Sequence, residues 1–174
     1  MFEIQLTPIA ILRSPFKDKF GLPRQAGLTP SASAYVDFIQ PYDEPEACSG
    51  LDDFSHLWIT FAFHRNDNTK WRPLIRPPRL GGNKKIGVFA SRSSFRPNGL
   101  GLSAVKLIAV HVESGATRLE IECPDIVDGT PIYDIKPYIS YADALPEANS
   151  AYASAPPPPT LTVCFNAASE SILE

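Results

Sequence analysis

The chain has 174 residues, of which 44% are hydrophobic and 20% charged, and its formal net charge is −3. This length fits one domain with a real core, and the composition is that of an ordinary soluble globular protein. The apolar runs are too short to span a membrane. The first fifteen residues contain Glu3 but no basic region or cleavage site, so we expect no signal peptide.

Strand patterns dominate the chain, and turn clusters separate them. In chain order, β-rich or alternating stretches occupy residues 2–12, 34–39, 56–64, 86–90, 104–112, 118–123 and 160–165. The 56–64 stretch places Leu57, Ile59, Phe61 and Phe63 on one face. Residues 44–54 favour a short helix. Seven or eight short strands predict an all-β fold, mainly β with short helices, in a closed or nearly closed antiparallel barrel.

The chain divides into two regions by composition. Residues 1–144 contain nearly all the strand patterns and form the predicted barrel domain. Residues 145–160 are rich in proline and small side chains, which is typical of an extended linker. We expect residues 145–174 to comprise this linker, a final strand and the start of a C-terminal extension.

Basic charge is concentrated in residues 65–106, which contain ten lysines and arginines and one acidic residue, Asp67. The formal charge of this segment is therefore +9, and the rest of the chain is acidic. Clustered charge steers anions even when net charge is negative, so the segment predicts nucleic-acid binding. A solvated basic face is the simpler alternative.

Three other sequence patterns are weaker evidence for function. Gly99–Ala104 matches a dinucleotide-binding motif, but it follows a polar turn and precedes a strand pattern, so we reject a Rossmann fold. His56 and His64 share one strand without a nameable third ligand, and we expect no metal. The three cysteines lack metal-type spacing, which favours buried thiols in a reducing cytoplasm.

Two loops have the composition of ligand-binding segments. Residues 125–139 place three aspartates and two tyrosines beside a Gly-Thr-Pro turn. The loop either forms a local turn bonded by Asp128 or presents backbone and carboxylates to a small ligand. Residues 16–25 form a polar loop that ends in Pro23, Arg24 and Gln25, whose side chains include two multidentate hydrogen-bonding groups.

Together these stretches resemble one family over nearly the whole chain. The matching segments are "SPFKDKFGLPRQAGL", "FSHLWITFAFH", "RPPRLGGNKKIGVFASRSSFRPN" with "LGLSAVKL", and "VDGTPIYDIKPYI". They resemble the S-adenosylmethionine-dependent methyltransferases that act on N6 of threonylcarbamoyladenosine next to the tRNA anticodon. The resemblance implies a single-sheet β-barrel outside the Rossmann class, a homodimer and the anticodon loop of tRNA as partner.

The resemblance also implies site residues. S-adenosylmethionine is expected to contact Pro23, Arg24, Gln25, His64, Arg65, Arg92, Leu102, Asp125, Ile126, Val127, Asp128 and Gly129. Phosphates and the threonyl carboxylate are expected to contact Arg76, Arg79, Lys84, Lys85, Arg96 and Lys136. Candidate proton acceptors are Asp134, Tyr133 and Tyr138.

Two other functions stay open from the residues alone. An RNA-binding barrel without catalytic activity explains the basic segment equally well, but it leaves residues 125–139 and 22–25 without a role. A hydrolase that uses His56 or His64 lacks a nucleophile. Binding of S-adenosylmethionine separates the methyltransferase from the RNA-binding barrel.

Overall fold

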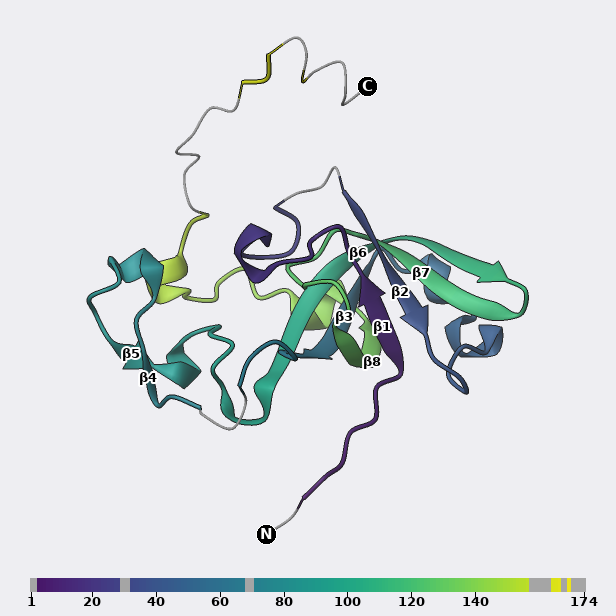
Figure 1. The fold of residues 1–174 in the computed structure, drawn as a ribbon, viewed down its shortest axis with the longest axis horizontal. Helices are drawn as coiled ribbons and strands as arrows, with labels where there is room; N and C mark the ends of the chain where they lie inside the picture. The colour runs from purple at the N-terminus through teal and green to yellow at the C-terminus, as the bar shows by residue number, and fades with distance from the viewer. Residues whose placement is uncertain (1–2, 29–31, 68–70, 157–163, 167–168, 170–174) are drawn as a thin grey trace.

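The protein was analysed as a computed structural model that describes residues 3–28, 32–67, 71–156, 164–166 and 169. Within these residues, six antiparallel strands close into a barrel in the order β1-β2-β7-β6-β3-β8, and β8 pairs back onto β1 (Figure 1). The barrel strands are β1 (Ala10–Arg13), β2 (Ser33–Phe38), β3 (His56–Ala62), β6 (Leu100–Glu113), β7 (Ala116–Glu122) and β8 (Pro131–Pro137). The predicted closed antiparallel barrel is confirmed.

The barrel core follows from the alternation of side chains along each strand. In β3, Leu57, Ile59 and Phe61 point inward and are at most 4% exposed. Leu119 and Ile121 of β7 meet them from another strand and are fully buried. One apolar cluster therefore fills the barrel, and the shared face predicted for the apolar residues of 56–64 is confirmed for its first three positions.

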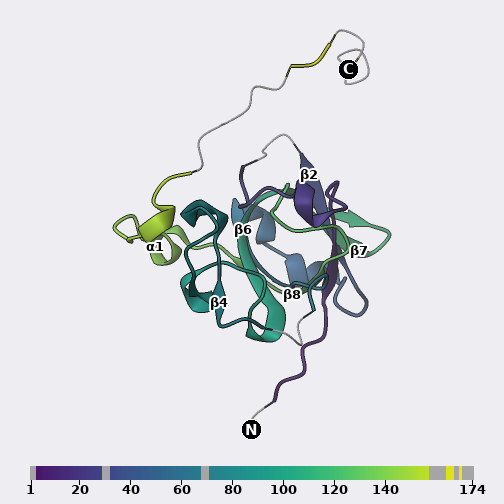
Figure 2. The ribbon, with the colours of Figure 1, turned by 60° about the vertical axis from the view of Figure 1, so that its left-hand side comes forward.

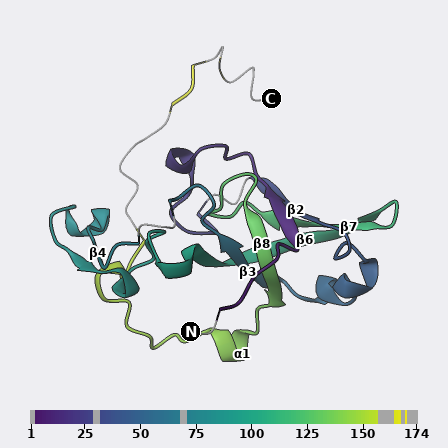
Figure 3. The same cartoon turned by 60° about the horizontal axis from the view of Figure 1, so that its bottom comes forward.

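Strands β6 and β7 form a long hairpin that projects from the barrel (Figure 3). Its two-residue turn, Ser114 and Gly115, has φ angles of 53° and 83°. Positive φ at both turn positions matches the right-handed twist of the two strands. Residues 100–104 lie at the start of β6 and open no helix, in agreement with the rejection of a Rossmann fold.

Short elements connect the strands. They are the 3-10 helices η1 (Lys19–Gly21), η2 (Pro45–Cys48), η3 (Leu51–Asp53), η4 (Pro78–Leu80), η5 (Val88–Ala90), η6 (Pro97–Gly99) and η7 (Ala151–Ala153), the α-helix α1 (Ser140–Asp143), and the strands β4 (Leu74–Ile75) and β5 (Ile86–Gly87). The predicted helix over residues 44–54 is instead two 3-10 turns, separated by Gly50 at φ 80°.

Other sequence-based boundaries are corrected. The first strand begins at Ala10, not at residue 2, and the strand predicted over residues 86–90 ends at Gly87. Strand β8 was not predicted, because residues 125–139 were interpreted as a loop. The strand predicted over residues 160–165 lies mostly outside the described residues.

Residues 63–99 leave the barrel between β3 and β6, and we call them the basic excursion. They contain the small β4–β5 ribbon and three 3-10 helices and lie beside the barrel (Figures 1 and 2). Helix η7 packs against η4 of the excursion. No helix in the described part of the chain is long and apolar enough to cross a membrane.

Candidate functional site

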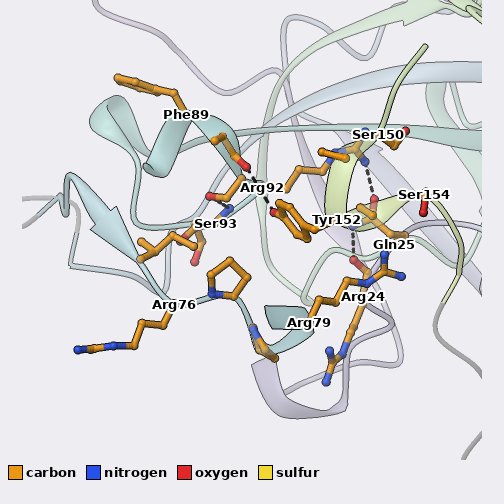
Figure 4. Close-up of a pocket in the computed structure, with 18 of the residues that line it drawn as sticks. Arg24, Gln25, Arg76, Arg79, Phe89, Arg92, Ser93, Ser150, Tyr152 and Ser154 are labelled. Carbon is orange, nitrogen blue, oxygen red and sulfur yellow. Dashed lines mark hydrogen bonds between the residues drawn. The ribbon is translucent and has the colours of Figure 1, made fainter. Parts of the chain in front are cut away.

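A large cavity lies between the basic excursion and two other stretches of chain, and we call it the basic pocket (Figure 4). Its volume is about 1210 Å³. Residues 24–28, 72–95 and 149–156 contribute its lining. The pocket therefore joins the loop after β1, the basic excursion and the segment that follows α1.

The lining of the basic pocket is strongly positive. No aspartate or glutamate stands among its lining residues, and within the described chain none of its cations has a carboxylate partner in an ion pair. Positive side chains that converge without carboxylates create a field that attracts anions. The cations are Arg24, Arg72, Arg76, Arg79, Lys85 and Arg92.

Arg92 connects two walls of the basic pocket. Its Nη1 atom donates a hydrogen bond to Oε1 of Gln25, which fixes the loop after β1 against the excursion. Arg96 braces the same part of the excursion from within, because its Nη1 atom donates to the carbonyl oxygens of Ser91 at 2.7 Å and Val88 at 3.3 Å. Arg92 thus remains at the pocket surface while Arg96 holds the loop's shape.

A smaller cavity, the inner pocket, adjoins the basic pocket at Ser94, which lines both. Its volume is about 190 Å³. It lies at the end of the barrel where β3 leads into the excursion and where the chain approaches β8. Its other lining residues are Lys19, Leu22, Phe61, Ala62, Phe63, His64, Arg65, Asn66, Asp125, Ile126, Val127 and Thr130.

Two titratable groups of the inner pocket are perturbed by burial. Desolvation raises the pKa of Asp125, and the hydrogen bond from Oγ of Ser103 at 2.7 Å and the charge of Arg92 partly oppose this effect. Desolvation and the neighbouring Arg65 lower the pKa of His64. The inner pocket therefore favours the less charged form of both side chains.

Asp128 has a structural contact that neither sequence interpretation anticipated. Its Oδ1 atom accepts a hydrogen bond from the backbone N–H of Ser14 at 3.0 Å, and its Oδ2 atom lies 2.9 Å from Nζ of Lys17. The Ser14 hydrogen bond and Lys17 hold the pKa of Asp128 below its usual range. Asp128 therefore ties the loop after β1 to the approach to β8, and its side-chain partners in the described residues are Ser14 and Lys17 rather than its own turn.

The structure distributes the predicted cofactor residues over three places. Arg24, Gln25 and Arg92 line the basic pocket, whereas His64, Arg65 and residues 125–127 line the inner pocket. Leu102 is 59% exposed on the outward side of β6, and neither pocket includes Pro23, Leu102, Asp128 or Gly129 in its lining. Cofactor contact by these residues stays a prediction.

The predicted RNA-binding residues divide similarly. Arg76, Arg79 and Lys85 line the basic pocket, and Lys84 does not. Lys136 lies on β8 and forms an ion pair with Asp134 at 3.4 Å. The three proton-acceptor candidates Asp134, Tyr133 and Tyr138 line neither pocket, and the ring of Tyr138 packs 5.6 Å from that of Trp58.

Sequence reasoning missed one wall of the basic pocket and its aromatic side chains. Residues 149–156 had been assigned to a linker, yet they line the pocket with Tyr152 among them. Phe89 and Phe95 also line it, and their position among arginines in the sequence is the available signal. In the described residues, no group of three or more histidine, cysteine or acidic side chains is placed to hold a metal ion.

Comparisons with known proteins give one consistent result. A family model described as the tRNA-methyltransferase O N-terminal domain matches residues 11–144. The tRNA (adenine(37)-N6)-methyltransferase of Escherichia coli (strain K12) is 47% identical over 99% of this chain and 74% of its own length. A Pseudomonas aeruginosa protein named as an S-adenosylmethionine-dependent methyltransferase is 49% identical over 87% of this chain and 62% of its own.

Solved structures agree with the sequence comparison. The crystal structure of TrmO from Pseudomonas aeruginosa superposes with a TM-score of 0.75 at 40% identity, over 90% of this chain. The chain spans 66% of that structure's length.

Proposed function

The chain belongs to the tRNA-methyltransferase O family, and we propose that it transfers a methyl group from S-adenosylmethionine to N6 of threonylcarbamoyladenosine at tRNA position 37. The names of its relatives support the reaction, the donor and the position of the adenine. The single observation that carries the proposal is the junction at Ser94, where a strongly positive pocket meets a small, partly apolar one. A positive surface suits the phosphates of RNA, and a partly apolar cavity suits a small-molecule methyl donor.

The residues of the two pockets fit the chemical groups of S-adenosylmethionine. Arg92 and Arg24 offer guanidinium groups for its carboxylate, and Arg92 is already oriented by Gln25. Asp125 offers a carboxylate, oriented by Ser103, for an ammonium or hydroxyl group. Phe61, Ile126 and Val127 offer apolar surface for a purine ring. When bound, the molecule supplies an electrophilic methyl group.

The protein's own part in the reaction is positioning and proton removal. The acceptor nitrogen must sit about 3 Å from the methyl carbon and lose a proton, so rigid placement supplies much of the rate. Arg76, Arg79 and Lys85 are suited to hold phosphates, and Arg79 is also suited to pair with the threonyl carboxylate. Asp134 and the two tyrosines line neither pocket, and we propose that they act as proton acceptors across a subunit interface.

A homodimer is therefore part of the proposal. The outward side of β3 and β6 carries the half-buried Trp58 and the exposed Leu102 and Ile108, with Leu102 59% and Ile108 48% exposed. Apolar side chains on a sheet face are typical of a two-fold interface. Light scattering at micromolar concentration should give twice the monomer mass; a monomer would contradict this part of the proposal. Cytoplasmic location and a C-terminal extension that begins within residues 145–174 complete it.

Cofactor binding is the first experiment. Calorimetric titration with S-adenosylmethionine should show binding, and Arg92→Ala should weaken it by about 1.5–3 kcal/mol because a charged hydrogen bond is lost. Arg118→Ala is the matched control, since Arg118 pairs with Asp37 on the barrel and lines neither pocket. RNA binding without any cofactor binding would instead identify a barrel that binds RNA without catalysis.

Substrate choice is the second experiment. Methyl incorporation is measured with two tRNAs that differ only in the threonylcarbamoyl group. We expect the modified tRNA to react at least about 10²-fold faster. Plain adenosine lacks the threonyl carboxylate, so the cations that would pair with this carboxylate are left without a partner. Equal rates would contradict the threonylcarbamoyl specificity and leave a general adenine methyltransferase.

A further inference from the structure

The wall formed by residues 149–156 lies beyond the residues that the family model matches, 11–144. It is held against the basic excursion by the packing of η7 on η4 and by a hydrogen bond from the Tyr152 hydroxyl to the carbonyl oxygen of Ala90 at 3.4 Å. Figure 4 shows Tyr152 in the middle of the basic pocket, among Arg92, Gln25 and Arg24. The ring is half-buried and lines the cavity.

Aromatic rings and cations alternate over the surface of the basic pocket. Phe89 is 75% exposed and Phe95 40% exposed. The guanidinium of Arg72 lies 5.2 Å from the ring centre of Phe95, and that of Arg96 lies 5.9 Å from the ring centre of Phe89. Exposed rings beside cations, in a cavity without carboxylates, match single-stranded nucleic acid better than duplex.

We propose that Tyr152 is a stacking platform for an unpaired base of the RNA loop, with Phe89 as a second platform at the edge of the same pocket. The inference rests on the proposed function and assigns specificity residues to it. Bases in an RNA loop can be splayed onto aromatic faces, whereas bases in a duplex cannot. The basic pocket therefore selects a loop, and the cations alone select only an anion.

The hydrogen bond to Ala90 explains why a tyrosine suits this position. The hydroxyl anchors one end of the ring to the excursion, so the ring is oriented before RNA arrives. The sequence neighbours Ala151, Ala153 and Ser154 are small and line the same cavity. A ring that is held in one orientation can offer its flat face to a base of the RNA.

The test uses three variants and two RNA probes. Tyr152→Ala removes the ring, Tyr152→Phe removes only the hydroxyl, and Tyr141→Ala removes a tyrosine that is 92% exposed on α1, outside the basic pocket. The probes are a short RNA hairpin with an anticodon-type loop and a fully paired RNA duplex of equal length. Dissociation constants are measured by fluorescence anisotropy over a range of salt concentrations, with circular dichroism to confirm folding.

We expect Tyr152→Ala to weaken hairpin binding about 5- to 150-fold, the range for loss of one stacked base. Duplex binding and the salt dependence should not change, because no charge is removed. Tyr152→Phe should keep most of the hairpin affinity, and Tyr141→Ala should bind as the unaltered protein does.

Several results would overturn the platform. Equal losses for hairpin and duplex, or a loss in Tyr152→Phe as large as in Tyr152→Ala, would show that Tyr152 only holds the wall in place. Tighter binding by Tyr152→Ala would show that the ring fills the pocket. The proposed function fails separately, when the unaltered protein binds no S-adenosylmethionine or methylates no tRNA.

Discussion

The barrel and the basic pocket differ in how their cationic side chains are compensated. On the outside of the barrel, Arg13 and Arg118 contact Asp37 at 3.2 and 2.7 Å, and Lys136 contacts Asp134 at 3.4 Å. Within the described residues, the six cations of the basic pocket form no such ion pair. Charges that the protein does not compensate are available to an external anion. This difference supports a division of roles in which the barrel provides the stable fold and the basic excursion binds the ligand.

Apolar side chains show the same difference. Ile59 and Leu119 of the barrel are fully buried, whereas Leu74 and Phe89 of the excursion are 54% and 75% exposed. Buried apolar area is the main source of folding free energy. Stability should therefore reside in the barrel and ligand binding in the excursion, and four experiments test this separation.

The largest expected effect is on the barrel core. Ile59→Ala should lower the free energy of unfolding by about 2–5 kcal/mol, because it leaves a cavity among fully buried side chains. Leu74→Ala in the excursion should change it by less than about 0.5 kcal/mol. Urea denaturation measures both. Similar losses in the two variants would show that the excursion is part of the cooperative core.

A second experiment adds one methyl group where two strands approach closely. A Cβ atom at Gly101 would lie 2.3 Å from Cζ of Phe61, the residue paired with Gly101 across β3 and β6. Gly101→Ala should cost about 1–3 kcal/mol of stability through overpacking. Gly87→Ala in the excursion is the control, because no atom lies within 4 Å of its added Cβ.

The side chain of Phe61 also lines the inner pocket, so Gly101→Ala is expected to change the shape of that pocket as well as the stability of the barrel. Combining Gly101→Ala with Phe61→Leu should recover part of the lost stability, since the smaller side chain relieves the contact. Additive losses in the double variant would show that the destabilisation has another source.

The third experiment removes charge from the basic pocket. In Arg79→Ala/Lys85→Ala, the loss of tRNA affinity between 50 and 200 mM salt should shrink by about tenfold, because two phosphate contacts are gone. The paired cations give the control, and Arg13→Ala/Arg118→Ala should keep the original salt dependence. Filter binding measures both slopes. An equal change in the two double variants would contradict a ligand role specific to the basic pocket.

The smallest effect is pH-dependent and concerns Asp128. Its pKa is lowered by the Ser14 hydrogen bond and by Lys17, so its stabilisation is present above the ordinary Asp pKa of about 3.9 and is lost as pH falls through the lowered value. Asp128→Ala should cost about 1 kcal/mol at pH 7. In acid the two proteins should converge. A difference that persists unchanged at low pH would rule out the ionised carboxylate as its cause.

Most barrel strands were predicted from the sequence because each has one buried, apolar face and one more exposed face. Leu57, Ile59 and Phe61 alternate with more exposed residues, and this period of two is visible without any structure. Strand β8 was missed because Pro131, Asp134 and Pro137 interrupt its pattern, and because the three aspartates of residues 125–139 suggested a loop. Pairing with β1 and β3 on either side overrides that local preference.

Site residues were predictable from the sequence only where a short stretch of chain contains the chemical groups that indicate binding. Arg76, Arg79 and Lys85 were identified from charge density, and they meet in the basic pocket. Tyr152 was not identified, because the proline- and alanine-rich segment around it has no periodicity and its position depends on packing against η4. The link of Ser103 to Asp125 depends on β6 meeting the chain before β8, which no short stretch of sequence contains.

The barrel fixes the two ends of the basic excursion next to each other. Ala62 and Leu100 are the last paired residues of β3 and β6, and the N–H of Phe63 still donates to the carbonyl oxygen of Gly99 at 2.8 Å. The entropic cost of closing such a loop rises only slowly with its length. Changes in the length of the intervening chain should therefore cost little free energy as long as the pairing of Ala62 with Leu100 is kept. The basic excursion is thus an insertion between two neighbouring points of the barrel, and substitutions within it are expected to alter ligand binding while the barrel stays unchanged.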